Sequence, residues 1–294
     1  MRDLLSTNSK LEKTVDGHAF TIRGLSFAPA NHSGREVCQW RGACADLCVL
    51  WFAGRTVTAS VRNAAIERTK LFFSDRPAFV RQLCAELTLA SVKASSAGTQ
   101  LLVRLNTASD IVWERVAPEV VEHIGALGCQ MYDYTKARYS QRADVPSHYH
   151  LSHSIHEKTT LEDIEQAIDN GRNVVAVIES KYRANGRTKS FGFVPDYIDF
   201  HSKDGKRSRT VWCVDGDQHD ARVPAVDGRG KCVVLRAKGS RAKIEQAINK
   251  GFVFMTGDNW TTREKTCQPW KQTSETLKGT GVIEGSRLFV RLSA

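Results

Sequence analysis

Three cysteines lie within eleven residues of one another near the start of this chain. Cys38, Cys44 and Cys48 have the spacing Cys-x5-Cys-x3-Cys, in a loop that contains glycine and polar residues. Thiolates at short spacing are soft ligands that suit zinc or an iron–sulfur cluster. Because chance clustering this tight is uncommon, the spacing predicts a metal site in this loop.

Three thiolates leave a fourth ligand position to be filled, and the sequence allows two solutions. In a structural zinc site the fourth ligand comes from the protein, and His32 is the nearest candidate in the sequence. In an open iron–sulfur site the fourth position is left for a small molecule. Both alternatives remain open at this point.

Polar side chains follow most of the predicted strands at the point where each strand ends. If the strands are parallel, these groups converge at one edge of the sheet and share a site with the cysteines. The residues in question are Asn106, Ser109 and Asp110; Asp133 and Lys136; Ser152 and Ser154; and Asp215, Asp217 and Asp220.

Two of these segments resist the simpler explanation that strands usually end in polar loops. Arg104 lies inside an apolar strand, where a charge needs a partner. The segment from Asp215 to Asp220 holds three acids and one histidine in six residues. It could bind a divalent cation, orient a substrate or form a solvated turn, since Asp-Gly readily makes turns.

The charge balance indicates a polyanionic partner. The formal net charge is +10, which favours nucleic acid or an anionic substrate, although such an excess also aids solubility. Aromatic residues interleave with the basic ones between residues 180 and 209, a pattern typical of phosphate contact with base stacking. The alternative is an exposed, solvated loop. The candidate nucleic-acid residues are Lys181, Arg183, Arg187, Lys206, Arg207 and Arg209.

The elements that must position these residues alternate between strands and helices. The predicted strands cover residues 19–26, 101–106, 129–134, 149–155, 174–178, 211–215, 232–236 and 252–255, and the predicted helices cover 59–73, 78–93, 112–127, 161–170 and 243–250. This alternation predicts an α/β protein with mostly parallel strands and helical crossovers. A full or partial (β/α) barrel is the preferred fold, and an open doubly wound sheet is the alternative.

The predicted organisation is one large domain with two flanking segments. A polar N-terminal arm covers residues 1–18. The barrel-like domain covers 19–258, with the cysteine loop at 29–48 and a basic excursion at 180–209. A C-terminal extension covers 259–294, a small appendage with a last strand at 287–291. No apolar window is long enough for a membrane span, the start is not a secretory signal, and a reducing cytoplasm suits the cysteines.

Several motifs, in order from about residue 20 to 245, together resemble a family of uncharacterised proteins from phages, plasmids and bacterial genomes. The motifs are Cys44-x3-Cys48, Arg62-Asn-Ala-Ala-Ile-Glu-Arg-Thr69, Arg104-Leu-Asn-Thr-Ala-Ser-Asp110, Tyr132-Asp-Tyr-Thr-Lys136, Tyr149-His-Leu-Ser-x-Ser154, Val214-Asp-Gly-Asp-x-x-Asp-x-Arg222 and Leu235-Arg-Ala-Lys-Gly239. A phage-borne gene would place the protein in the cytoplasm of the bacterial host.

The layout, with a cysteine loop after the first strand, is similar to that of radical S-adenosylmethionine enzymes. This resemblance implies that the three cysteines bind a [4Fe–4S] cluster whose open iron takes up S-adenosylmethionine. It implies that Asp133, Ser152, Ser154 and Asp217 contact cofactor or substrate. Taken with the polar strand ends, the predicted catalytic residues are Asp133, Asp215, Asp217 and Lys136, and the predicted cofactor-binding residues are Arg104, Asn106, Asp110, Ser152 and Ser154. The expected function is an iron–sulfur enzyme acting on nucleic acid or another anionic substrate. The alternative is a zinc-stabilised nucleic-acid-binding protein associated with replication.

Overall fold

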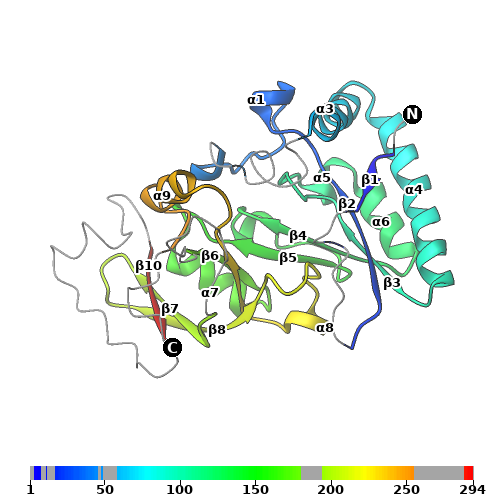
Figure 1. Ribbon diagram of the computed structural model, residues 1–294. Coiled ribbons are helices and arrows are strands. Elements are labelled where there is room, and N and C mark those ends of the chain that lie inside the picture. Colours follow the sequence, from blue (N-terminus) through cyan, green and yellow to red (C-terminus); the bar gives the residue numbers. More distant parts are fainter. Residues whose placement is uncertain are drawn as a thin grey trace, which may run out of the picture. The chain divides into compact units, whose positions relative to one another are not determined.

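The computed structural model divides into two compact units (Figure 1). It describes residues 3–7, 11, 17–45, 48, 58–179, 194–254 and the backbone of 288–293. The first unit is formed by Met1–Arg41, Leu50–Ser152 and Gln218–Val226, and the second by Gly42–Val49, His153–Asp217 and Asp227–Ala294.

The first unit is built on a mostly parallel set of strands. These strands are β1 (Leu5–Ser6), β2 (Phe20–Leu25), β3 (Gln100–Arg104), β4 (Gln130–Thr135) and the greater part of β5 (Tyr149–Ser154). Strands β2, β3 and β4 are parallel, and the short β1 pairs antiparallel with β2. The carboxyl ends of the parallel strands therefore share one edge.

Helices of the first unit cover one face of these strands. They are α1 (Ala30–Ser33), α3 (Ala59–Ser74), α4 (Arg76–Ser96), α5 (Trp113–Val116) and α6 (Pro118–Ala126), with a 3₁₀ turn, η3 (Tyr139–Gln141). Asp75 caps α4 by accepting a hydrogen bond from the backbone N–H of Ala78 at 3.0 Å. The prediction of one continuous helix over 112–127 is wrong. The chain breaks at Ala117 because Pro118 lacks an N–H and is suited to begin a new helix.

Side-chain alternation gives the strands of the first unit two buried faces. Val103 and Met131 point to the helix-covered face, where they pack among residues of α4 and α6 such as Leu87 and Ile124. Leu102 points to the other face. The second face is covered by Ala221, Val223 and their neighbours, which pack with Ile22, Leu102 and Tyr132.

A buried ion pair fastens the covering segment to the second face. Arg104 Nη1 lies 2.7 Å from Asp220 Oδ2 and 2.9 Å from Oδ1. Tyr132 donates its hydroxyl to the same carboxylate at 3.0 Å, and the Tyr134 ring centroid lies 4.7 Å from the guanidinium carbon. Asp220 is completely buried. The expectation that Arg104 needs a partner is confirmed.

The second unit is also mostly parallel. It contains the end of β5, then β6 (Val174–Ile178), β7 (Tyr197–Ser202), β8 (Ser208–Asp215), β9 (Cys232–Arg236) and β10 (Leu288–Ser293), with the order β5-β6-β9-β8-β7-β10. The pairs among β5, β6, β9 and β8 are parallel, whereas β7 pairs antiparallel with both β8 and β10. The predicted last strand is therefore present, and it extends this sheet.

Two helices sandwich strand β6 of the second unit. The helical elements are η1 (Ala43–Ala45), α7 (Leu161–Asp169), α9 (Arg241–Asn249) and α8 (Pro224–Asp227), which begins in the first unit. Thr160 and Asp163 form a capping box at the start of α7. Ile164 of α7 packs with Ala176 on one face of β6, and Ile244 of α9 packs with Val177 on the other.

The mixed α/β class and the mostly parallel sheet are confirmed, while closure into a barrel stays a prediction. The prediction of an exposed excursion is wrong over 197–202, where Ile198 and Phe200 of β7 are buried. Residues 180–193 lie outside the described part. The strand predicted at 252–255 is reduced to a parallel bridge between Phe254 and Ile178. Within the described ranges, no helix has the length and apolar character to cross a membrane.

The Asp220→Ala substitution tests the buried ion pair. It leaves the Arg104 guanidinium buried without its carboxylate, so we expect a loss of about 3 to 5 kcal/mol in the free energy of unfolding. Urea denaturation followed by circular dichroism measures this loss. Glu245→Ala, which removes the exposed pair of Arg241 and Glu245 on α9, is the control and should leave the midpoint unchanged. An equal response of the two variants would contradict the assignment.

Candidate functional site

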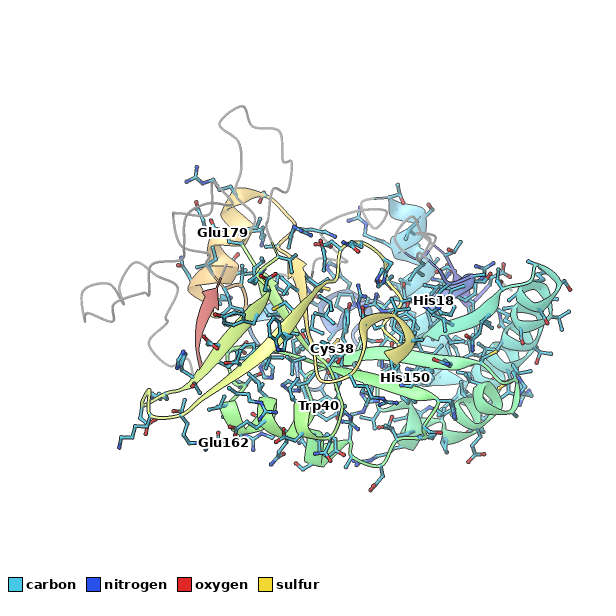
Figure 2. The ribbon with its side chains drawn as sticks, turned by 90° about the horizontal axis from the view of Figure 1, so that it is seen from below. His18, Cys38, Trp40, His150, Glu162 and Glu179 are labelled. Atoms are coloured by element: carbon cyan, nitrogen blue, oxygen red, sulfur yellow. The ribbon has the colours of Figure 1, made fainter. Side chains whose placement is uncertain are left out.

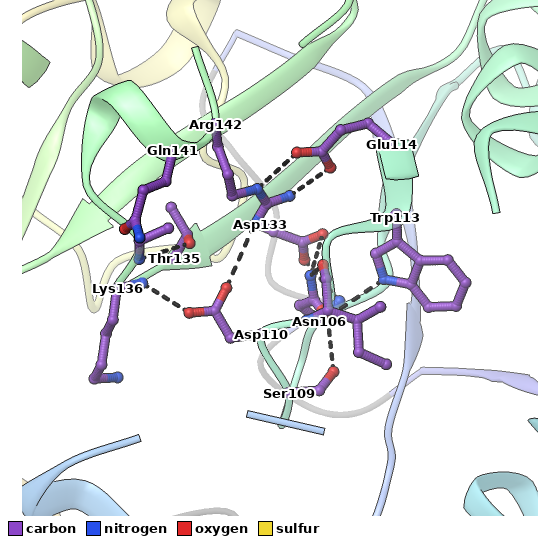
Figure 3. Close-up of polar contacts among 12 residues, drawn as sticks. Asn106, Ser109, Asp110, Trp113, Glu114, Asp133, Thr135, Lys136, Gln141 and Arg142 are labelled. Atoms are coloured by element: carbon purple, nitrogen blue, oxygen red, sulfur yellow. Dashed lines mark hydrogen bonds and ion pairs between the residues drawn. The ribbon is translucent and has the colours of Figure 1, made fainter. Parts of the chain in front are cut away.

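A buried polar network lies at the carboxyl ends of the parallel strands in the first unit (Figure 3). Asn106 is the second residue after β3, and Asp133 lies in the second half of the neighbouring β4. Because β3 and β4 run parallel, these two residues come together at the same edge. The network is therefore where ligands are bound in α/β proteins.

The side chain of Asn106 organises the loop that follows β3. Its Oδ1 accepts hydrogen bonds from the Ser109 hydroxyl at 2.7 Å, the Ile111 N–H at 3.0 Å and the Trp113 indole N–H at 3.3 Å. Its Nδ2 donates to the Ile111 carbonyl at 2.9 Å. The loop thus has a fixed shape, set by one amide at its first position.

Asp133 holds Asn106 from the adjacent strand. Its Oδ1 accepts the backbone N–H of Asn106 at 2.7 Å, and its Oδ2 accepts Asn106 Nδ2 at 3.3 Å and the Tyr149 hydroxyl at 3.0 Å. Asp133 has no exposed surface. Burial raises the pKa of Asp133 to about 7, although the hydrogen bond from the Asn106 backbone opposes the shift. This carboxyl can therefore gain or lose a proton near neutral pH.

Arg142 contacts two acids of the network directly and a third through a tyrosine hydroxyl. It forms a two-point ion pair with Glu114, with Nε and Nη2 at 2.8 and 2.7 Å from the carboxylate oxygens. Its Nη1 lies 3.3 Å from Asp110 Oδ1, and its Nη2 donates to the Tyr149 oxygen at 3.1 Å. A chain of donors thus runs from Arg142 through Tyr149 to Asp133.

Asp110 belongs to the same network and lies in the loop after β3. Its Oδ2 accepts the backbone N–H of Lys136 at 2.8 Å. Burial raises the pKa of Asp110, while the Lys136 N–H and the Arg142 charge lower it. The predicted residues Asn106, Asp110, Asp133 and Lys136 are therefore brought together, with Lys136 half-exposed beside them.

Cys38 lies at the same edge of the first unit (labelled in Figure 2). The Asp110 N–H donates to the carbonyl of Val37 at 2.8 Å, and the Cys38 thiol is 3.8 Å from the Ala108 carbonyl oxygen. The Asn106 loop is thus a neighbour of the first cysteine.

Cys44 and Cys48 belong to the second unit; all three cysteines are partly exposed, and none of the three is in a disulfide. In the part of the chain that the structure describes, no three His, Cys, Asp or Glu side chains are already gathered to hold a metal ion. Beside Cys44, Oε2 of Glu157 is buried without a hydrogen-bond partner, and the absence of a side chain on Gly42 lets the same carboxylate approach the backbone closely. Three cysteines supply the donor type of a thiolate-held metal, and the metal site itself stays a prediction.

Asp215 ends β8 in the second unit and Asp217 follows it; both are matched by cations at the end of β9, Arg236 and Lys238. Arg236 contacts both oxygens of Asp215 at 2.9 Å, and Lys238 Nζ lies 2.8 Å from Asp217 Oδ1. Gly216 between them is close to β9, where an added Cβ would lie 2.5 Å from a Val233 methyl. The prediction that polar strand ends converge holds within this unit, where the two acids form internal ion pairs.

The remaining predicted site residues are placed elsewhere. The side chain of Arg104 lies on the same face of β3 as Leu102, where it pairs with Asp220. The opposite face, which carries Val103, is the one that the helices cover. Ser152 and Ser154 are buried on β5, the first in one unit and the second in the other.

The candidate nucleic-acid residues are only partly described. Arg207 pairs with Glu162 (labelled in Figure 2) at 2.8 Å and with Glu165, both on α7, and Arg209 pairs with Asp169 at 2.6 Å. Lys206 is exposed, 4.0 Å from an Asp204 oxygen. Lys181, Arg183 and Arg187 lie outside the described residues.

Sequence reasoning missed Arg142, Tyr149 and Glu157 as members of polar networks. Arg142 lies in a polar stretch between two strands, where nothing in its neighbourhood indicates complete burial. Tyr149 begins the motif Tyr149-His-Leu-Ser-x-Ser154, and that position could have indicated a role in the network. Glu157 follows His156 at the end of β5 and was passed over as a loop acid.

The fold and the polar edge define a mixed α/β protein with a cysteine-bearing loop after its second strand. The chain belongs to the family described as gene product 88, whose model matches residues 3–254. Comparison with curated proteins and with solved structures found no match.

The Asp133→Asn substitution tests the buried carboxyl. In the unfolded chain this carboxyl ionises at its ordinary, lower pKa, so between that value and about 7 the unfolded state has lost a proton that the folded state keeps. Ionisation therefore favours unfolding as the pH rises through this window. We expect the wild type to lose stability relative to Asp133→Asn over this range.

Urea midpoints of both proteins at several pH values measure this difference. Asp144→Asn, at an exposed position, controls for the loss of a surface charge. A difference between wild type and Asp133→Asn that stays constant from acid to neutral pH would exclude the raised pKa.

Proposed function

We propose that this protein is an iron–sulfur enzyme of the radical S-adenosylmethionine type that acts on nucleic acid or another anionic substrate. The observation that carries the proposal is the position of Cys38, whose thiol lies 3.8 Å from Ala108 O in the loop fixed by Asn106 and Asp133. A cysteine loop at the carboxyl edge of parallel strands has the place where α/β enzymes carry their chemistry.

Cys38, Cys44 and Cys48 would hold the cluster. When bound, such a cluster supplies an electron and an open iron for a small molecule. The protein's own contribution is positioning. Asp133 holds the Asn106 loop from beneath and, being wholly buried, acts through that loop rather than on a substrate.

Lys136 is the polar group of this edge best placed to meet a substrate, and the buried Asp110 holds its backbone N–H. Asp110 is fixed between the Lys136 N–H and Arg142, so its carboxylate has a single orientation. The half-exposed Lys136 supplies a cation for an anionic group. Gain or loss of a proton by Asp133 alone would adjust the charge beneath this edge, because Asp133 titrates near neutral pH while Tyr149 and Arg142 beside it keep their protons.

A zinc-stabilised nucleic-acid-binding protein associated with replication is the second candidate. The net charge of +10 favours it, as does the exposed Lys206 in the β7–β8 hairpin. In this alternative the cysteine loop is structural, and the polar edge of the first unit stabilises the fold.

Metal analysis of protein purified without oxygen separates the two candidates. About four irons per chain, together with the brown colour of a thiolate-held cluster, supports the enzyme. One zinc in a colourless protein supports the binding protein. A preparation that holds neither metal after reconstitution with either would end both proposals.

The Cys44→Ala substitution tests the ligand assignment within the same preparation. We expect loss of bound metal and a lower melting temperature, because a metal-held loop loses its crosslink. Cys84→Ala, at a half-buried thiol of α4, is the matched control and should keep the metal. Metal content equal to wild type in Cys44→Ala would remove this cysteine from the site.

A further inference from the structure

A cluster of charged and polar side chains lies on the face of β3 and β4 that the helices of the first unit do not cover. Arg104 is the last residue of β3, and the two tyrosines of β4 alternate to this same face. The segment that follows β8 supplies the other members, and all of them belong to the first unit. The cluster consists of Arg104, Tyr132, Tyr134, His219, Asp220 and Arg222.

Arg104 uses only part of its guanidinium for contacts within the described part of the chain. Both hydrogen bonds of this side chain come from Nη1, which donates to the oxygens of Asp220 at 2.7 and 2.9 Å. Its Nε is buried and has no hydrogen-bond partner there. Nε and Nη2 lie on one edge of a guanidinium and together match two oxygens of one anion. This edge of Arg104 therefore has no acceptor among the described residues.

An N–H of a buried cation that lacks an acceptor is costly, so its retention needs a reason. Arg142 of the same unit, which is also buried, donates from all three of its guanidinium nitrogens. The side chain of Arg104 is 11% exposed, so its guanidinium lies in a largely dry place that solvent still reaches. The difference between the two arginines indicates a place for a group that the chain itself does not supply.

A second guanidinium meets the same tyrosine as Arg104. The guanidinium carbon of Arg104 lies 4.7 Å from the ring centroid of Tyr134, and Arg222 Nε donates to the hydroxyl of Tyr134 at 3.0 Å. Arg222 is 2% exposed, and its Nη2 donates to the carbonyl of His219 at 2.6 Å. The six members of the cluster thus include two guanidinium groups and one carboxylate, which favours an anion at this place. Tyr134 and His219 are only half-buried, so the cluster reaches the surface beside them.

We propose that the Nε–Nη2 edge of Arg104 binds an oxyanion, a phosphate group or a carboxylate, beside Tyr134. Asp220 holds the guanidinium in place through Nη1 and leaves the opposite edge to the ligand. Arg222 adds a second positive charge at the hydroxyl of Tyr134. The site contains no cysteine and needs no metal, so the inference goes beyond the proposed function.

Arg104→Lys tests the edge while it keeps a positive charge beside Asp220. Lysine is a point charge and lacks the planar pair of donors that fits two oxygens. We measure the affinity of the full-length protein for inorganic phosphate and for succinate by isothermal titration calorimetry, with potassium chloride at equal ionic strength as the blank. We expect the affinity for the oxyanion that binds to fall roughly 10- to 100-fold, the effect of a lost charge-assisted hydrogen bond.

Two further variants support the measurement. The double variant Arg104→Met and Asp220→Asn removes both charges together, so no unpaired charge stays buried, and the amide oxygen can still accept the Tyr132 hydroxyl. It should fold and should also lose the oxyanion. Arg236→Lys is the matched control, since its side chain is 14% exposed against 11% for Arg104 and is also paired with an aspartate. It should keep the affinity of the wild type.

The possible results separate this inference from the proposed function. Weaker binding in Arg104→Lys and in the double variant, with folded proteins by circular dichroism and an unchanged Arg236→Lys, supports the site. Equal affinity in the wild type and both Arg104 variants places the oxyanion elsewhere and overturns the inference, as does a wild type that binds neither phosphate nor succinate. Either negative result leaves the metal site untouched, and a protein that holds no metal leaves the oxyanion site standing.

Discussion

The demand of one buried carboxylate for hydrogen-bond donors organises the first unit. Asp133 lies without exposed surface on a central strand, and an ionised or neutral carboxyl there must be satisfied from within the protein. The donors come from Asn106 on one side and Tyr149 on the other, so the loop after β3, strand β4 and the first residue of β5 are tied to one another. Asn106 then fixes the loop beside Cys38, and the geometry of the candidate site follows from that single burial.

The second unit also has carboxylates at the end of a strand, but it satisfies them with ion pairs. Asp215 and Asp217 also stand at a strand end, but each is partly exposed and directly paired with a cation that follows the neighbouring strand. Asp133 has hydrogen-bond donors but, among the residues that the structure describes, no direct ion pair, and its burial raises its pKa toward neutrality. The difference in burial and pairing thus gives one unit a group that can exchange protons and gives the other a neutralised turn.

Much of this arrangement was predictable from local patterns, and the rest depended on distant partners. Hydrophobic periodicity gave most of the strands and helices, and the apolar surroundings of Arg104 required a partner that Asp220 supplies. The break at Pro118 was a readable signal that the long apolar pattern concealed. The burial of Arg142 and the contact of Glu157 with Ala43 had no local signal, because each is defined by residues far away in the chain.

The net charge of +10 overstates how many cations are available to bind a polyanionic partner. The two described arginines of the β7–β8 hairpin that looked available for phosphates, Arg207 and Arg209, are paired with acids of α7. A phosphate would have to displace those carboxylates, and the gain in each exchange is small because both states are ion pairs. Any affinity for a polyanion must therefore be carried by cations without such a partner, and among the hairpin residues Lys206, 82% exposed and only loosely paired at 4.0 Å, fits this requirement better than either arginine.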